Sequence, residues 1–343
     1  MNEPGMVPES AQAREARLKA GLEAVFQAEL SRPVSVSDLV ITSAGARRGN
    51  VLFTATEPGG EGRRYCVTYL PTLDIELLPI PQEAALFHLA EAQGVPVPHV
   101  HFATEDPQWV GGPLFVSDCV VGETVPRRVL RKVAAEGTGE TIAAQLGSAF
   151  AALHSIDPTL APPALARPEG SPVEDALART DQQLRELLQP SPIFSYAQRW
   201  LETHAPPAGE GFAIVHGDVR NGNVIIDKQG LAAVLDWEVA KVGDPLEDLA
   251  WTCLRCWRFG EDDKEVGGFG DRAPFVTAYE AGGGTFDPER FHWWKVLGTY
   301  RWGLGLAGQA AAHLDGRFSN IVMAMSGRRV GELEYDLLSL LKP

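Results

Sequence analysis

The chain has 343 residues, of which 45% are hydrophobic and 22% are charged, and its formal net charge at pH 7 is −15. This length allows two lobes with a large buried core rather than one small domain. The negative charge disfavours nucleic acid and anionic membrane surfaces as partners, because a polyanion would be repelled unless the chain carried a local basic stripe.

The sequence pattern over residues 1–120 predicts a small lobe built around a sheet. Apolar residues at helical spacing predict a leading helix over residues 13–30. Strand-like segments separated by glycine-containing turns follow at residues 37–43, 50–56 and 64–70. A helix over residues 83–92 and a last strand over residues 113–120 complete this part.

The remainder of the chain predicts a larger, mainly helical lobe with two short strands in its middle. The strands are expected at NVIID (residues 223–227) and LAAVLDWE (residues 231–238), with turn residues between them. Helices are expected at residues 141–154, 172–188, 194–204, 248–259, 274–279, 288–313 and 321–341. The chain is therefore expected to be α+β, with an antiparallel-sheet lobe over residues 1–117 and a helical lobe over residues 118–343.

The lengths of the hydrophobic runs and the number of cysteines indicate the cellular compartment to expect. No apolar run approaches the roughly 18 residues of a membrane-spanning helix. The four cysteines, Cys66, Cys119, Cys253 and Cys256, are too few and too scattered for a disulfide framework, which suits a reducing cytoplasm. Cys253 and Cys256 form a C-x-x-C without a second pair, so we expect structural thiols rather than a zinc site.

The strongest functional signal is HGDVRNGN (residues 216–223), which an acid in VLDWE (residues 234–238) follows. Asp218 and Asn223 are five positions apart, and Asp236 comes 18 positions after Asp218. This order matches the catalytic-loop D-x-x-x-x-N and the later metal-binding Asp of protein-kinase-like folds. Both acids are expected at strand ends that face one cleft, where metal-assisted phosphoryl transfer requires them. Simple turn and helix caps are the alternative reading of these acids.

The stretch over residues 214–251 resembles the aminoglycoside phosphotransferase family. It contains H-G-D-x-R-x-G-N, L-D-W-E and G-D-P-x-x-D-L-A in this order, which is typical of the branch related to the kinase domain of some acyl-CoA dehydrogenase fusions. Weaker similarity extends over residues 40–310. The resemblance implies a bilobal protein-kinase-like fold and an ATP- and Mg²⁺-dependent transfer of phosphate to a small-molecule hydroxyl.

By the same resemblance, Asp218 is the catalytic base, and Asn223 and Asp236 are the Mg²⁺ ligands. Both side chains offer the hard oxygen atoms that Mg²⁺ prefers. His216 is expected to orient the loop by a hydrogen bond to the backbone near Asp236 rather than to act as an acid. Arg220 could either steady the loop or meet a phosphate.

Three further acids follow in this stretch. Glu238 could reach the metal through water or serve as a helix cap. Pro245 after Asp244 suggests that Asp244 is an N-cap, and Asp248, one turn along, would then brace the catalytic loop.

The segment SAGARRGN (residues 43–50) lies between two expected strands, where the family has its nucleotide-covering loop. Its candidate nucleotide-binding residues are Gly45, Arg48 and Asn50. A plain hairpin is an equally good reading of this segment. Residues 116–119 are expected to be the hinge whose backbone N–H and C=O groups read adenine, which involves Ser117, Asp118 and Cys119.

The chain departs from the family pattern on the third strand. Kinase-like folds place a cation there that pairs with the phosphates and with a helix Glu, here Glu83. This strand instead carries Thr68 or Tyr69 at the cation position. Four arginines near the site could supply the missing charge, namely Arg63, Arg64, Arg47 and Arg48. Without a replacement, the protein would be a catalytically weakened nucleotide-binding module.

The acceptor pocket is expected in the helical region after Asp248. This region supplies many aromatic residues and few acids: Trp251, Trp257, Trp293, Trp294, Tyr300, Arg301 and Trp302. Such a lining suits a polycationic sugar less well than an acidic cleft would, although helical aromatic residues also commonly belong to a core. A third reading, a metal-dependent hydrolase using Asp218 and Asp236, lacks further ligands at suitable spacing.

Overall fold

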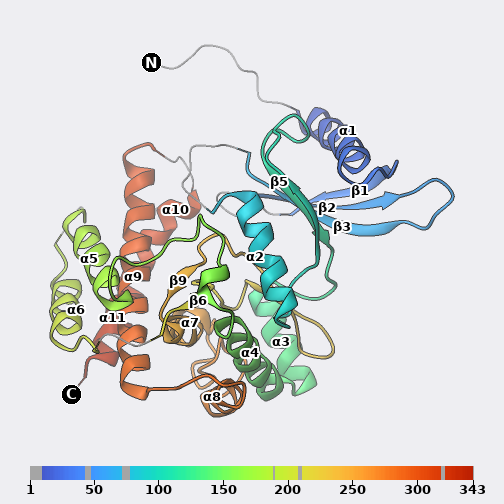
Figure 1. Ribbon diagram of the computed structural model, residues 1–343. Helices are drawn as coiled ribbons and strands as arrows, with labels where there is room; N and C mark the ends of the chain where they lie inside the picture. Colours follow the sequence, from blue (N-terminus) through green and yellow to red (C-terminus); the bar gives the residue numbers. More distant parts are fainter. Residues whose placement is uncertain are drawn as a thin grey trace. The chain divides into compact units, whose positions relative to one another are not determined.

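The structure is a computed structural model that describes residues 10–42, 48–71, 78–187, 190–207, 211–317 and 321–342. The chain divides into two compact units (Figure 1). Unit 1 consists of Met1–Glu91, Val97–Val120 and Pro162–Ala164, and unit 2 consists of Ala92–Pro96, Val121–Ala161 and Leu165–Pro343.

Unit 1 is built on one antiparallel sheet with the strand order β1-β2-β3-β5-β4. Its elements are α1 (Ala11–Leu30), β1 (Ser35–Ile41), β2 (Gly49–Thr56), β3 (Arg63–Tyr69), α2 (Ile80–Ala92), β4 (Val100–Thr104) and β5 (Leu114–Asp118). The leading helix and the first three strands lie where the sequence pattern predicts them. β4 was not predicted, because its five residues carry no turn signal that separates them from the preceding Pro-rich segment.

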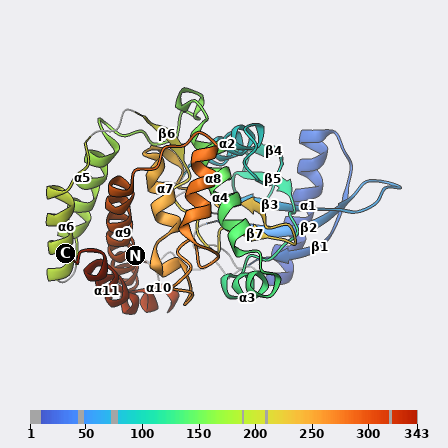
Figure 2. The ribbon, with the colours of Figure 1, turned by 90° about the horizontal axis from the view of Figure 1, so that it is seen from below.

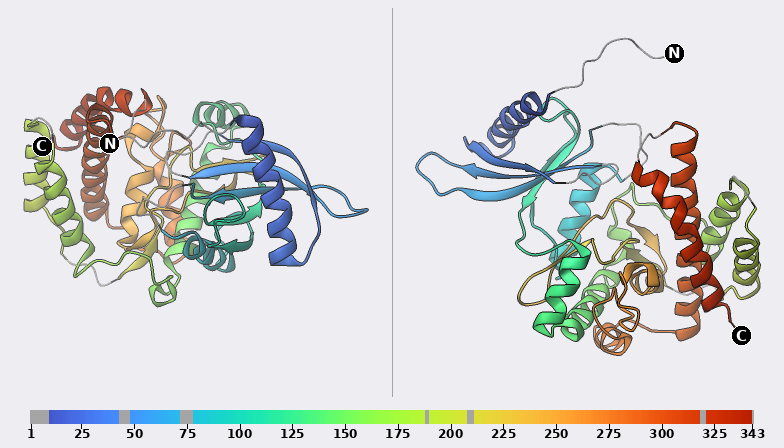
Figure 3. Two further views of the ribbon diagram at one scale, coloured as in Figure 1. Left: turned by 90° about the horizontal axis from the view of Figure 1, so that it is seen from above. Right: turned by 180° about the vertical axis from the view of Figure 1, so that it is seen from behind.

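The first helix, α1, crosses one face of the sheet (Figure 3). Side chains on β2 and β3 alternate between this buried face and a half-buried one. The ring of Phe26 from α1 meets Phe53, Tyr65 and Phe102 edge-on, at centroid distances of 6.0, 5.3 and 5.4 Å. Burial of this apolar face fixes α1 on the sheet and leaves Asn50 and Thr68 on the opposite face.

Unit 2 is mainly helical. Its helices are α3 (Pro126–Glu136), α4 (Gly139–His154), α5 (Pro172–Arg185), α6 (Pro192–Thr203), α7 (Pro245–Thr252), α8 (Arg272–Ala281), α9 (Pro288–Leu314), α10 (Ile321–Ser326) and α11 (Val330–Leu340). The long α9 packs against α6, α7 and α11, and α4 packs against α8 (Figure 2). Two short ladders pair β6 (Ala213–Val215) with β9 (Lys241–Gly243) and β7 (Val224–Ile226) with β8 (Leu231–Val234). Within the described ranges, no helix has the length and apolarity that crossing a bilayer requires.

One expectation for unit 2 needs correction. The helix expected over residues 248–259 begins at Pro245 and ends at Thr252, because Leu254 adopts an extended backbone before the 3-10 turn Arg255–Trp257. The helix α3 exposes Arg127, Arg128 and Arg131, while Val129 and Val133 bury its other face.

Close packing of α1 gives a stability prediction. An Ala at position 21 would place its Cβ 1.7 Å from the backbone oxygen of Trp109. We expect Gly21→Ala to lower the free energy of unfolding by about 2 kcal/mol or more, since a backbone clash outweighs the gain of roughly 1 kcal/mol in helix propensity. The matched control is Gly308→Ala on α9, where no atom lies within 4 Å and we expect a gain of about 1 kcal/mol. Urea unfolding followed by circular dichroism measures both changes, and equal stability of the two variants would contradict this packing.

Candidate active site

The loop between β6 and β7 carries Asp218 and is held by a buried carboxylate on α7. Asp248 accepts hydrogen bonds from the backbone N–H groups of His216 (2.8 Å) and Gly217 (2.7 Å), and from the His154 ring (3.2 Å). Gly217 has a φ of +81°, which a glycine adopts without strain. Asp244 caps α7 by accepting from the Leu246 N–H. The predicted roles of Asp248 as a brace and Asp244 as a cap are both confirmed.

The His216 ring connects this loop to the strand end that carries Asp236. It is fully buried, its Nε2 lies 3.1 Å from the Leu235 carbonyl oxygen, and its Nδ1 lies 3.2 Å from the Asp218 backbone nitrogen. A ring that donates from Nε2 and accepts at Nδ1 is neutral. Burial lowers the pKa of His216 below its ordinary value, which favours this neutral form. The predicted orienting role of His216 is confirmed.

Three side chains donate hydrogen bonds to the carboxylate of Asp218. Trp251 Nε1 and Arg220 Nε donate to Oδ1, at 2.8 and 3.2 Å. Asn223 Nδ2 donates to Oδ2 at 2.8 Å. Burial raises the pKa of Asp218, Arg220 counteracts this shift, and the charge of nearby Asp236 adds to it. A carboxylate with a raised pKa, held in one orientation, is suited to accept a proton.

Asn223 and Asp236 present oxygen atoms to the same neighbourhood. The Asn223 amide nitrogen donates to the backbone oxygen (2.9 Å) and the carboxylate of Asp218, so the amide oxygen points away from both. Asp236 is exposed and has a φ of +68°, which costs energy in a residue other than glycine. Within the described residues its carboxylate has no hydrogen-bond or ion-pair partner. One amide oxygen and one uncommitted carboxylate fit Mg²⁺, which takes few protein ligands when phosphates supply others.

Arg220 steadies the base rather than projecting away from it. Besides its bond to Asp218, its guanidinium lies 4.8 Å from the centroid of the Trp257 ring. Trp257 lies 5.5 Å from Trp251 and 4.9 Å from Trp302, and we call these three residues the tryptophan cluster. The cluster therefore contacts Asp218 directly through Trp251 and indirectly through Arg220, which lies between Trp257 and Asp218.

The sequence reasoning missed the hydrogen bond from Trp251 to Asp218. Trp251 was expected only as an acceptor-pocket aromatic residue, yet it lies three positions after Asp248 on α7. Residues three apart share one helix face. Since Asp248 was already expected to brace the loop, the spacing indicated that Trp251 faces the same loop.

In unit 1, Arg48 is the arginine that pairs with Glu83. Its guanidinium forms an ion pair with the Glu83 carboxylate, both side chains are almost completely buried, and Arg48 also donates to the Leu78 carbonyl oxygen at 2.8 Å. Thr68 donates its hydroxyl proton to Asn50 Oδ1 at 2.7 Å. Arg63 pairs instead with Asp118. Gly45 and Arg47 lie outside the described residues.

The expected hinge lies at the end of β5. This strand lies between β3 and β4, so its edges are already paired, and Ser117 faces Cys66 and Val100. The N–H of Asp118 donates to the His99 oxygen (2.9 Å) and that of Cys119 donates to the Arg64 oxygen (3.3 Å). These two N–H groups are bonded within unit 1, and the hinge over residues 116–119 stays a prediction.

The cysteines are free thiols, as expected. Burial raises the pKa of Cys253 to about 12, and it also raises that of Cys256. Among the described residues, no three His, Cys, Asp or Glu side chains form a group able to hold a metal.

Solved structures have a similar fold. A protein of Ralstonia eutropha assigned as an aminoglycoside phosphotransferase has a TM-score of 0.71 at 22% identity, over 93% of this chain and 97% of that one. A thermostable mutant of aminoglycoside phosphotransferase APH(4)-Ia, in a ternary complex with AMP-PNP and hygromycin B, has a TM-score of 0.55 at 16% identity, over 92% and 98%. The predicted bilobal protein-kinase-like α+β fold is confirmed, and fold and site together define a kinase-like phosphotransferase.

Sequence comparison identifies the family. The model of the phosphotransferase enzyme family matches residues 38–294, and the chain belongs to this family. It is 29% identical over 168 residues to acyl-CoA dehydrogenase family member 10 of Mus musculus. That match spans 47% of this chain and 15% of the mouse protein.

The neutral state of His216 gives a pH prediction. The unfolded chain binds a proton at this residue near its ordinary pKa of 6.5, whereas the buried ring binds it only at lower pH. The unfolded state therefore binds more protons below pH 6.5, and the stability that the neutral ring contributes above this pH is lost as the pH falls.

We expect the free energy of unfolding to fall more steeply between pH 7.5 and pH 5 in the wild type than in His216→Gln. The Gln side chain keeps an N–H donor for Leu235 but does not titrate. Urea unfolding at both pH values measures the difference, and parallel losses in the two proteins would argue against a neutral buried ring.

Proposed function

We propose that the protein transfers the γ-phosphate of ATP to a hydroxyl group of a small molecule in a Mg²⁺-dependent reaction. The observation that carries this proposal is the convergence of Asp218, Asn223 and Asp236. The first is a half-buried, oriented carboxylate with a raised pKa, and the other two offer oxygen atoms without a counterion. This division between base and metal ligands is the one that phosphoryl transfer needs.

Each residue of the candidate site has a distinct role in this proposal. Asp218 accepts the proton of the acceptor hydroxyl, while Trp251 and Arg220 hold its Oδ1 atom in place. Asn223 and Asp236 hold Mg²⁺, which neutralises charge on the nucleotide phosphates when bound. His216 holds the Asp218 loop next to the strand end that carries Asp236, through its two hydrogen bonds.

Arg48 and Glu83 support nucleotide binding in unit 1. A buried Arg–Glu pair beside the start of β2 gives the chain the cation that its third strand lacks. The hydroxyl of Thr68 fixes the side chain of Asn50. We propose that Asn50 contacts the nucleotide beside the Arg48–Glu83 pair. The structural neighbour solved with AMP-PNP supports a nucleoside triphosphate as donor.

We infer that the acceptor is a neutral or anionic hydroxyl compound rather than a polycationic sugar. The tryptophan cluster and the guanidinium of Arg220 lie beside Asp218, and these groups are apolar and cationic rather than acidic. Trp251 and Trp257 are themselves buried, as are Trp293, Trp294 and Tyr300, and Trp302 is half-buried. Hygromycin B is the ligand of a structural neighbour, and it belongs in the acceptor panel as a comparison.

A weakened nucleotide-binding module remains the second candidate. The replacement of the strand cation by Thr68 favours it, and the Arg48–Glu83 pair argues against it. Nucleotide binding without transfer to any acceptor would identify this second function.

Removal of the base tests the proposal directly. We expect Asp218→Ala to reduce phosphate transfer from labelled ATP by about 10²–10⁴-fold, because a positioned general base contributes on this order. Binding of Mg²⁺·AMP-PNP should remain, since Asn223 and Asp236 are unchanged. The control Glu280→Ala removes an exposed acid on α8 and should leave transfer intact. Full activity of Asp218→Ala would exclude Asp218 as the base.

The Arg48–Glu83 pair gives a separate prediction for nucleotide binding. Arg48→Met alone should lower stability by about 3–5 kcal/mol, because it leaves the buried Glu83 charge without its partner. The double change Arg48→Met and Glu83→Met should recover most of that stability, and it should still bind Mg²⁺·AMP-PNP about tenfold or more weakly than the wild type. Calorimetry on the double variant, with exposed Arg64→Met as control, separates the two effects. Wild-type affinity in the double variant would mean that Arg48 is purely structural.

A further inference from the structure

The start of β2 carries the two residues that are proposed to bind the nucleotide in unit 1. Gly49 lies between Arg48 and Asn50 in the chain. Arg48 pairs with Glu83, and the Thr68 hydroxyl donates to Asn50 Oδ1 at 2.7 Å. Because the three residues are consecutive, a shift of the Gly49 backbone would move both nucleotide-binding residues.

The ring of Tyr69 lies directly against Gly49. The two residues are partners in the register of β2 and β3, and both are buried on the face of the sheet that α1 crosses. A Cβ at position 49 would come within 2.4 Å of the ring, so the ring takes the space that a side chain would need. The position of the Tyr69 ring therefore limits the position of the Gly49 backbone.

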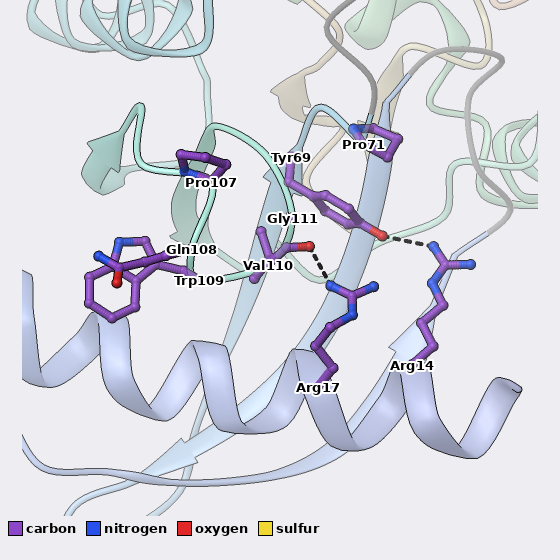
Figure 4. A pocket seen from close by; sticks show the side chains of 9 residues that line it. All are labelled: Arg14, Arg17, Tyr69, Pro71, Pro107, Gln108, Trp109, Val110 and Gly111. Atoms are coloured by element: carbon purple, nitrogen blue, oxygen red, sulfur yellow. Dashed lines mark hydrogen bonds between the residues drawn. The ribbon is translucent and has the colours of Figure 1, made fainter. Parts of the chain in front are cut away.

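Arg14 holds the tip of this ring from the first turn of α1. Its Nη2 atom donates to the Tyr69 hydroxyl at 2.7 Å (Figure 4). Further along the same helix, Arg17 donates to the Val110 carbonyl oxygen at 2.6 Å, which ties α1 to the loop between β4 and β5 (Figure 4). Tyr69 is thus held at both ends, by the sheet at its backbone and by a charged donor at its hydroxyl.

From these contacts we propose that Arg14 and Tyr69 are positioning residues for nucleotide binding. They act on Arg48 and Asn50 through the backbone of Gly49, from the face of the sheet opposite to the Asn50 side chain. This inference rests on the proposed function, because it requires Arg48 and Asn50 to bind the nucleotide. The first turn of α1 then contributes to nucleotide affinity without belonging to the binding site.

The same contacts predict how changes at the two positions combine. Tyr69→Phe keeps the buried ring against Gly49 and removes only the hydroxyl, so it should fold. Arg14→Ala removes the same hydrogen bond from the other side. Since both variants lose one shared bond, their effects on nucleotide affinity should not add.

Calorimetric titration of the full chain with Mg²⁺·AMP-PNP tests the inference. We expect Arg14→Ala and Tyr69→Phe each to weaken binding by about threefold to tenfold, the range over which residues outside a binding site change affinity. The double variant should bind no more weakly than the weaker of the two single variants.

Val25→Ala is the matched control. Val25 is buried on α1 in the same core, about three turns beyond Arg14. Its truncation should lower the urea midpoint of unfolding, because apolar packing is lost, and leave nucleotide affinity at the wild-type value, because the bond from Arg14 to Tyr69 stays in place.

The outcomes separate this inference from the proposed function. Wild-type affinity in either single variant, multiplied losses in the double variant, or an equal loss in Val25→Ala would overturn the inference and leave the proposed function standing. A wild-type protein that does not bind Mg²⁺·AMP-PNP would overturn both.

Discussion

The buried ring of His216 is the interaction on which the geometry of the active site depends. One of its nitrogen atoms bonds to the backbone of Asp218 and the other to the carbonyl of Leu235, next to Asp236. A side chain of this shape joins the two strand ends only while it is neutral, and complete burial favours that state by lowering its pKa. The carboxylate of Asp248 holds the same loop from the other side through two backbone amides. Apolar packing in unit 2 thus sets the position of the polar residues.

The arrangement of Asp218 and Asp236 is electrostatically unfavourable. Asp218 is half-buried and lies close enough to Asp236 for the two charges to interact. Asp236 has a left-handed backbone, and within the described residues its carboxylate has no hydrogen-bond or ion-pair partner. A folded protein keeps such an arrangement where binding compensates for it. In our account a divalent cation provides that compensation, and the donors on Asp218 keep the base oriented.

Periodic and local features of the fold could be predicted from the sequence, whereas long-range side-chain contacts could not. The spacing of apolar residues predicted α1, and the spacing of Asp218, Asn223 and Asp236 pointed to the candidate site. Both patterns can be recognised because their residues lie within a short stretch of the sequence. The choice of Arg48 among four arginines depended on a contact 35 positions along the chain, which no local pattern contains. The pairing of β4 with β5 could not be predicted either, because the five residues of β4 carry no turn signal that sets them apart from the preceding segment.

The central claim is that Asn223 and Asp236 jointly hold a metal ion on the nucleotide while Asp218 faces the acceptor. A crystal structure of the protein with Mg²⁺ and AMP-PNP tests it most directly. The account predicts one Mg²⁺ about 2.1 Å from the Asn223 amide oxygen and from an Asp236 oxygen, with Asp218 outside its coordination shell. A metal bound through Asp218, or a nucleotide bound away from Asn223 and Asp236, would contradict the account.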